Sequence, residues 1–215
     1  MLRPDPAWSA SRSPLPDATA LVPGGPGSQR ISPSQSPREG LPALGLAQTV
    51  VDDFGRPFRL PARTPERIVS MAPNITEILF ALGLGDRIVG VTRFCDYPPA
   101  TIAIRRIGGL VDPSLEIVRS LDPGLIVAFR GNPRRLVERM GTLGLPVFVC
   151  DIGEGLEALF PLIERIGRIT RTEGRAAGLA ADLRRRLDAV DAALKGVAAR
   201  PKVFVLLHGQ GLWTC

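Results

Sequence analysis

Continuous apolar runs alternate with helix-spaced apolar positions through the middle of the chain. The runs are short, as expected of strands buried on both faces in a parallel sheet, and they lie at 68–69, 88–91, 125–129 and 146–150. The segments between them repeat apolar residues at steps of three and four, which is the spacing of one helix face. The first such face consists of Ile75, Ile78, Leu79 and Leu82. This alternation predicts an α/β fold in which a Rossmann-like lobe is built on a parallel sheet.

Polar residues at the start of the helical segments predict where the helices begin. Asn74, with Glu77 three positions later, is expected to cap the first helix. Asp112 and Asn132 each precede a proline, and each is expected to cap a further helix. Ahead of the first strand, the segment TVVDDFGRPFRLP predicts a hairpin that turns near Phe54.

A long helix is predicted over 170–199. Thr170, with Glu173 three residues later, is expected to open it. Its apolar residues form a single stripe, again at steps of three and four: Leu179, Leu183, Leu187, Val190, Leu194 and Val197. The following segment, 202–207, is apolar and predicts one more strand.

The N-terminal segment has a different composition. Residues 1–46 are dense in Pro, Ser and Gly and have little aliphatic periodicity, so a disordered tail is expected. Residues 1–30 contain no apolar stretch of the roughly 7–15 residues that a secretory signal needs, so no signal peptide is recognised. The whole sequence lacks a run of about 18 apolar residues, the length of a membrane span.

Charge, cysteine content and motifs exclude several function classes. The net charge is +6, but the basic residues are dispersed among acidic ones and have few aromatic neighbours, so nucleic acid is not a predicted partner. Cys95, Cys150 and Cys215 lack metal-ligand spacing, so no metal site is predicted. The single histidine, His208, lies in HGQG, as in an oxyanion loop, yet the sequence has neither G-x-S-x-G nor a P-loop. An enzyme is therefore not predicted, and an α/β enzyme is a distant alternative.

Six segments occur in an order that resembles the class III periplasmic substrate-binding proteins, which serve ABC importers of vitamin B12, iron-siderophores and haem. They are TVVDDFGRPFRLP, RIVSMAPNITEILFALG, DYPP, SLEIV, LDPGLIVAF and GLPVFV, and together they cover the chain from about Thr49 onward. The resemblance is greatest to the cobalamin-binding branch. In that family one long helix joins two α/β lobes, and the ligand binds between them. The resemblance implies an N-terminal lobe at 47–169, a connector helix at 170–199, and at 200–215 the first strand of a second lobe that is largely missing.

The resemblance also implies ligand contacts at the carboxyl ends of the strands, the edge that ligands favour in α/β sheets. Phe94 and Phe129 match positions where corrinoid binders place stacking aromatics, and Leu110 matches a third where an aromatic is more usual. Core packing is the alternative for both phenylalanines. Asp96, Tyr97 and Arg130 are further candidate ligand contacts, although Tyr97 could instead pack on Pro98 and Pro99.

Glu116 is a candidate for docking to the membrane permease. A carboxylate in the first turn of a helix is favoured by the helix dipole, and this alone could explain the residue. The resemblance implies instead that it contacts arginines of the permease.

The sequence therefore predicts a substrate-binding component of an ABC importer that binds cobalamin, or a related corrinoid, and delivers it to the permease. The resemblance implies a monomer without a cofactor, in the periplasm or attached to a lipid anchor. An iron-siderophore or haem binder is the alternative within the family. A ferric catecholate requires clustered arginines, as Arg93 and Arg130 could supply, and haem requires an axial ligand such as Tyr97 or His208.

Overall fold

The computed structural model describes residues 48–197 and 201–202. The predicted N-terminal tail, the final predicted strand from residue 203 onward, His208 and Cys215 lie outside these residues. Among the described residues, no helix combines the length and the apolarity needed to cross a membrane.

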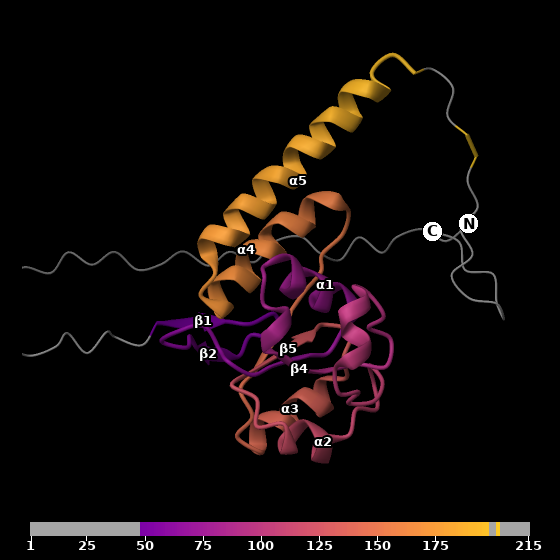
Figure 1. The fold of residues 1–215 in the computed structure, drawn as a ribbon. Helices are drawn as coiled ribbons and strands as arrows, with labels where there is room; N and C mark the ends of the chain where they lie inside the picture. The colour runs from indigo at the N-terminus through magenta and orange to yellow at the C-terminus, as the bar shows by residue number, and fades with distance from the viewer. Residues whose placement is uncertain (1–47, 198–200, 203–215) are drawn as a thin grey trace, which may run out of the picture. The chain divides into compact units, whose positions relative to one another are not determined.

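The centre of the fold is a four-stranded parallel sheet (Figure 1). Its strands are β3 (Ile68–Ser70), β4 (Ile88–Val91), β5 (Leu125–Phe129) and β6 (Val147–Cys150), in the order β4-β3-β5-β6. These strands match the continuous apolar runs, which confirms the predicted α/β class. Because the strands are buried on both faces, the residues alternate between two cores.

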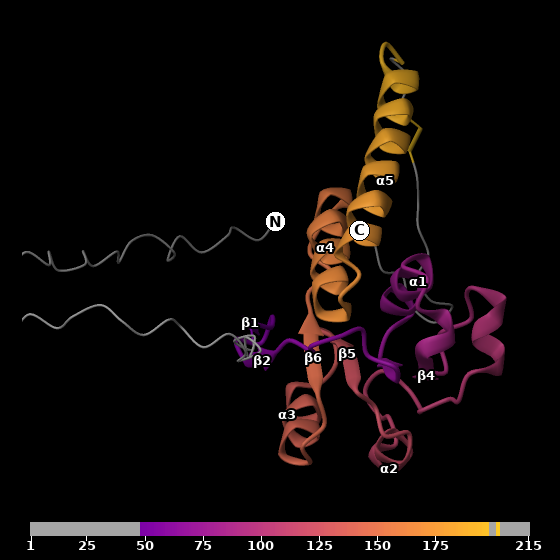
Figure 2. The same cartoon turned by 60° about the vertical axis from the view of Figure 1, so that its left-hand side comes forward.

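Helices cover both faces of the sheet, as Figure 2 shows. Strand residues such as Leu125 and Val127 face α1 (Pro73–Ala81), α4 (Leu159–Thr170) and α5 (Glu173–Leu194). Their neighbours Ile126 and Ala128 face α2 (Leu115–Ser120) and α3 (Arg134–Thr142). Short 3₁₀ turns complete the chain: η1 (Gly85–Arg87), η2 (Pro99–Ala103) and η3 (Leu156–Ala158).

The predicted hairpin is present beside the sheet. It pairs β1 (Thr49–Val51) with β2 (Pro57–Arg59) in antiparallel register, and the ring of Phe58 packs edge-on against Phe148 at 5.2 Å. Its turn also hydrogen-bonds to the edge strand β6, because the Asp53 N–H donates to Val149 O at 3.1 Å and the Asp52 carboxylate accepts from the Val149 N–H at 3.4 Å. The hairpin therefore closes this edge of the sheet. The opposite edge is closed at Val91, whose N–H donates to Arg105 O and whose carbonyl accepts from the Ile107 N–H.

The three predicted helix caps are wrong. The helix α1 starts after Ala72 without a side-chain cap, so Asn74 lies inside its first turn. The helix α2 is capped by Ser114, whose hydroxyl accepts from the Ile117 N–H at 3.2 Å, while Asp112 pairs with an arginine elsewhere. The helix α3 follows Pro133, and Asn132 uses its side chain for other contacts, described below.

The long helix α5 is shorter than predicted at both ends. It begins at Glu173 because Thr170 still belongs to α4, where its hydroxyl donates to Ile166 O at 2.7 Å. It ends at Leu194, ahead of Gly196 in the left-handed region (φ 88°). The first half of its stripe reaches the core through Leu179 and Leu183. The last three stripe residues are more than half exposed: Val190, Leu194 and Val197.

Candidate ligand-binding site

Exposed apolar side chains follow the carboxyl ends of the strands. Phe94 is 49% exposed and Tyr97 63% exposed, both in the loop after β4. Ile152 and Leu156 are exposed after β6, and Val111 is exposed in the loop before α2. Because ligands of α/β sheets favour the carboxyl ends of the strands, these apolar side chains mark this edge of the sheet as the candidate site.

The loop after β4 is fixed from the inside by a buried sulfur. Cys95 is fully buried, and its Sγ lies 3.2 Å from the Thr76 hydroxyl and 3.1 Å from the Thr92 hydroxyl. From the other side, the Arg106 guanidinium donates to Thr92 O at 3.0 Å and to Cys95 O at 2.6 Å. With Cys95 turned inward, the adjacent Phe94 is left on the surface.

The loop after β5 places Phe129 half-buried, with its ring lying over Gly131. A Cβ atom on Gly131 would come within 1.9 Å of the ring, so the ring occupies the space that any side chain at 131 would need. Asn132 is 2% exposed, and its side chain accepts from the Phe129 N–H at 2.9 Å and donates to Leu110 O at 2.7 Å. The half-buried Leu110 is thereby brought to the same loop as Phe129.

The two arginines of this edge are each paired with an aspartate. Arg93 donates to the two Asp112 oxygens at 2.9 and 3.0 Å, and the pair passes over Gly109, where a Cβ would collide with the Asp112 carboxylate. Arg130 donates to Asp151 at 2.6 Å. That hydrogen bond lowers the pKa of Asp151 and raises the pKa of Arg130.

A second charged group supports the loop after β6. The Asp53 carboxylate accepts hydrogen bonds from the Asp151 N–H and from Arg165, so the hairpin turn holds the start of that loop. Cys150 is buried beside it, and burial raises the pKa of its thiol, with the nearby Asp53 carboxylate adding to the effect. This thiol is therefore protonated at neutral pH. Among the described residues, no group of three His, Cys, Asp or Glu could hold a metal ion.

The structure places most of the predicted ligand contacts along one edge. Phe94, Asp96 and Tyr97 share the loop after β4 and are exposed, while Leu110 and Phe129 are linked through Asn132. Arg130 lies at the start of the next loop, paired as described. The exposed Glu116 lies in the first turn of α2, directly after the loop that carries Leu110.

The sequence interpretation missed three residues of this edge: Val111, Ile152 and Leu156. Ile152 carried a usable signal, because it is an apolar residue placed two positions beyond a buried strand. The sequence interpretation gave Asn132 a role as a helix cap, and it could not show the link to Leu110, because that carbonyl is 22 residues away.

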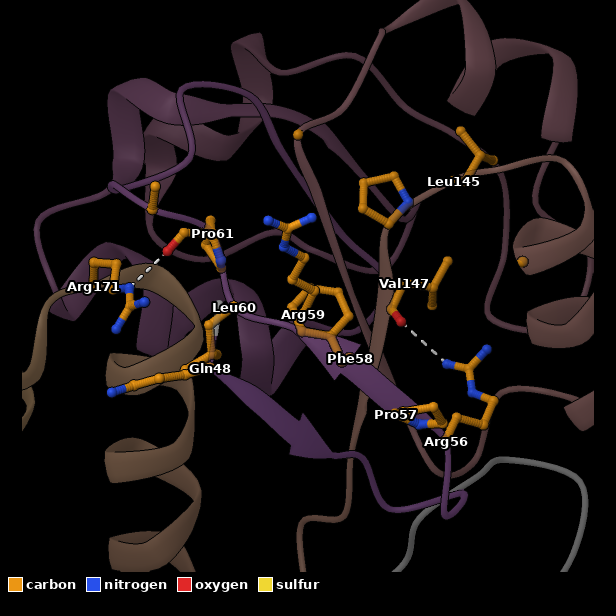
Figure 3. Close-up of a pocket in the computed structure, with 14 residues that line it drawn as sticks. Gln48, Arg56, Pro57, Phe58, Arg59, Leu60, Pro61, Leu145, Val147 and Arg171 are labelled. Atoms are coloured by element: carbon orange, nitrogen blue, oxygen red, sulfur yellow. Dashed lines mark hydrogen bonds between the residues drawn. The ribbon is translucent and has the colours of Figure 1, made fainter. Parts of the chain in front are cut away.

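A large cleft lies elsewhere, at the amino ends of β5 and β6 (Figure 3). It has a volume of about 960 Å³, and Arg56, Phe58, Arg59 and Arg171 contribute to its lining. Two of these arginines bind backbone: Arg171 donates to Pro61 O at 2.7 Å and Arg56 to Val147 O at 3.2 Å, as Figure 3 shows. These contacts tie the hairpin and the segment after it to the lobe. We therefore place the candidate ligand site at the carboxyl edge, which carries the exposed aromatic side chains of Phe94 and Tyr97.

Comparison with known proteins assigns the fold to a family. A family model described as "Periplasmic binding protein" matches residues 68–213, which is more than half of the chain. The chain belongs to the periplasmic binding protein family. Members of this family bind substrates for transport and are not enzymes, and the family is periplasmic.

Individual relatives agree with this assignment. A vitamin B12-binding protein of Yersinia pestis is 38% identical over 93 residues, which cover 43% of this chain and 33% of the relative. The periplasmic vitamin B12-binding protein of Vibrio cholerae superposes with a TM-score of 0.55 at 31% identity, covering 62% of this chain and 52% of that one. A periplasmic haem-binding protein of Roseiflexus sp. RS-1 superposes with a TM-score of 0.60 at 29% identity, covering 63% and 52%. The matched region thus spans about a third to a half of each relative.

Proposed function

We propose that this chain supplies one wall of a corrinoid-binding site, in the substrate-binding component of an ABC importer that delivers cobalamin to a membrane permease. The observation that carries the proposal is the chemistry of the carboxyl edge. It combines exposed apolar and aromatic side chains with arginines that are already neutralised by aspartates.

The paired charges favour a corrinoid over a ferric siderophore. A ferric catecholate is strongly anionic and requires free guanidinium groups. At this edge the charges of both Arg93 and Arg130 are already balanced by aspartates, so an anion gains less from either one. A corrin ring needs flat apolar area, and its neutral amide side chains can bind paired ions without a net charge on the site.

Haem is the second candidate, and Tyr97 is the observation that favours it. Tyr97 is the single tyrosine of the chain, is 63% exposed and lies on the loop that carries Phe94. A phenol in this place could act as an axial ligand to haem iron. The haem-binding relative at 29% identity is consistent with this candidate.

Glu116 supports the transport half of the proposal. Its carboxylate is exposed in the first turn of α2, which leaves it accessible to permease arginines. The predicted role in docking stays a proposal for this residue.

Calorimetric titration of the chain with cyanocobalamin, haemin and an iron tris-catecholate tests the proposal. The expected order of affinity has cyanocobalamin first and the tris-catecholate last. Tighter binding of the tris-catecholate would refute the charge argument. Tighter binding of haemin, with a Soret shift that Tyr97→Phe abolishes, would establish the second candidate instead.

A further inference from the structure

Asn132 is a buried polar residue whose side chain satisfies two backbone groups at once. It is 2% exposed, and buried polar groups need hydrogen-bond partners because desolvation is costly. Its Oδ1 accepts from the Phe129 N–H at 2.9 Å, and its Nδ2 donates to Leu110 O at 2.7 Å. Its own N–H donates to Phe129 O at 2.9 Å. One side chain therefore closes the turn after β5 and also holds a second loop.

The second loop depends on this contact at its tip. Its base is closed by two backbone hydrogen bonds, from the Ser114 N–H to Ile107 O at 2.7 Å and from the Arg93 N–H to Gly108 O at 2.8 Å. Between these points, Leu110 is held through its carbonyl by Asn132. Two of the candidate ligand contacts, Leu110 and Phe129, are thus oriented by a residue that is too buried to touch a ligand.

We infer that Asn132 is a positioning residue, which holds the Leu110 and Phe129 loops as one pre-formed ligand face. The inference rests on the proposed function, because it assigns a task within that binding site. When a binding site is formed in only a fraction of molecules, its apparent dissociation constant equals the intrinsic dissociation constant divided by that fraction. By linking the two loops, Asn132 keeps the fraction of molecules with a formed binding site high.

Asn132→Asp separates the two contacts of the side chain. A carboxylate still accepts from the Phe129 N–H, but it places an oxygen against the Leu110 carbonyl in place of a donor, so the link between the loops is lost. Asn132→Ala removes both contacts. Thr170→Val is the matched control, because Thr170 is also fully buried and its hydroxyl bonds to Ile166 O, at the junction of α4 and α5.

The test combines amide hydrogen exchange with calorimetric titration of cyanocobalamin. In Asn132→Asp, exchange of the Arg93 and Ser114 amides is expected to be about tenfold faster, and the dissociation constant about tenfold higher, the change produced by about 1.4 kcal/mol. Thr170→Val is expected to lower the melting temperature and leave both readouts unchanged.

Each outcome decides one part of the inference. Unchanged exchange in Asn132→Asp overturns it, whether or not the chain binds a corrinoid. Faster exchange with unchanged cyanocobalamin affinity also overturns it, since the loops would then be held for another reason. If the unaltered chain binds no cyanocobalamin, the proposed function fails, and the exchange of the Arg93 and Ser114 amides still shows whether Asn132 holds the two loops together.

Discussion

Replacing Phe94 with alanine tests the ligand face directly. The side chain is 49% exposed, so about half of it remains to be covered by a ligand. An aromatic side chain buries about 200 Å² in full, which leaves about 100 Å² at this position. At about 25 cal/mol per Å² that area is worth about 2.5 kcal/mol, or about sixty-fold in the dissociation constant. Because alanine keeps the Cβ atom, this is an upper limit.

The assay is titration calorimetry with cyanocobalamin, and Leu143→Ala is the control. Leu143 is also about two-fifths exposed, but it follows α3 near the amino ends of the strands. Its replacement is expected to leave the affinity unchanged. Phe94→Leu, which keeps part of the apolar area, is expected to fall between alanine and phenylalanine. A change of less than twofold in Phe94→Ala, or an equal loss in Leu143→Ala, would refute the placement of the ligand on this edge.

Three further predictions concern charge, packing and docking. Asp151→Asn is expected to strengthen binding of an iron tris-catecholate in calorimetry, because it leaves the charge of Arg130 unbalanced. Gly167→Ala is expected to lower the free energy of unfolding by about 1–3 kcal/mol in chemical denaturation, because its Cβ would lie 2.4 Å from a methyl group of α5. Glu116→Lys, in a two-lobed protein reconstituted with its permease, is expected to slow uptake without changing ligand affinity.

Each of these three predictions can be contradicted by a specific result. An unchanged tris-catecholate affinity in Asp151→Asn would show that Arg130 does not face the ligand. Gly178→Ala serves as control for Gly167→Ala, because a Cβ on Gly178 meets nothing within 4 Å in the structure; equal effects would refute the close contact between α4 and α5. Uptake at the unaltered rate in Glu116→Lys would leave Glu116 as a favourable first-turn charge.

The sequence predicted the sheet because burial on both faces leaves a continuous apolar run, a signal carried by each strand itself. Two of the three helix caps were mispredicted because their side chains are used by partners that are distant in sequence. Asp112 is bound by Arg93, and Asn132 by the carbonyl of Leu110, so neither is free to cap a helix. A local capping pattern contains no information on such partners.

Local sequence patterns were limited in the same way for the candidate ligand site, because they contain no information on distant partners. The sequence placed Phe94 and Phe129 at the ends of strands, and the structure has them there. It offered Arg130 as a candidate for binding an anion, because the aspartate that neutralises it lies 21 residues further along the chain. Charge pairing between loops depends on which strands are neighbours, and strand order is not encoded in any one segment.

The closed edges of the sheet have a consequence for association. An edge strand with free N–H and C=O groups is a template for another strand, and proteins that expose one tend to aggregate. Here the hairpin turn hydrogen-bonds to the backbone N–H and C=O of Val149 on one edge. On the other edge, Arg105 and Ile107 hydrogen-bond to the backbone N–H and C=O of Val91. An additional strand, from this chain or from another copy, would have to displace these contacts before it could join. We therefore expect any further strand of this protein to build a sheet of its own.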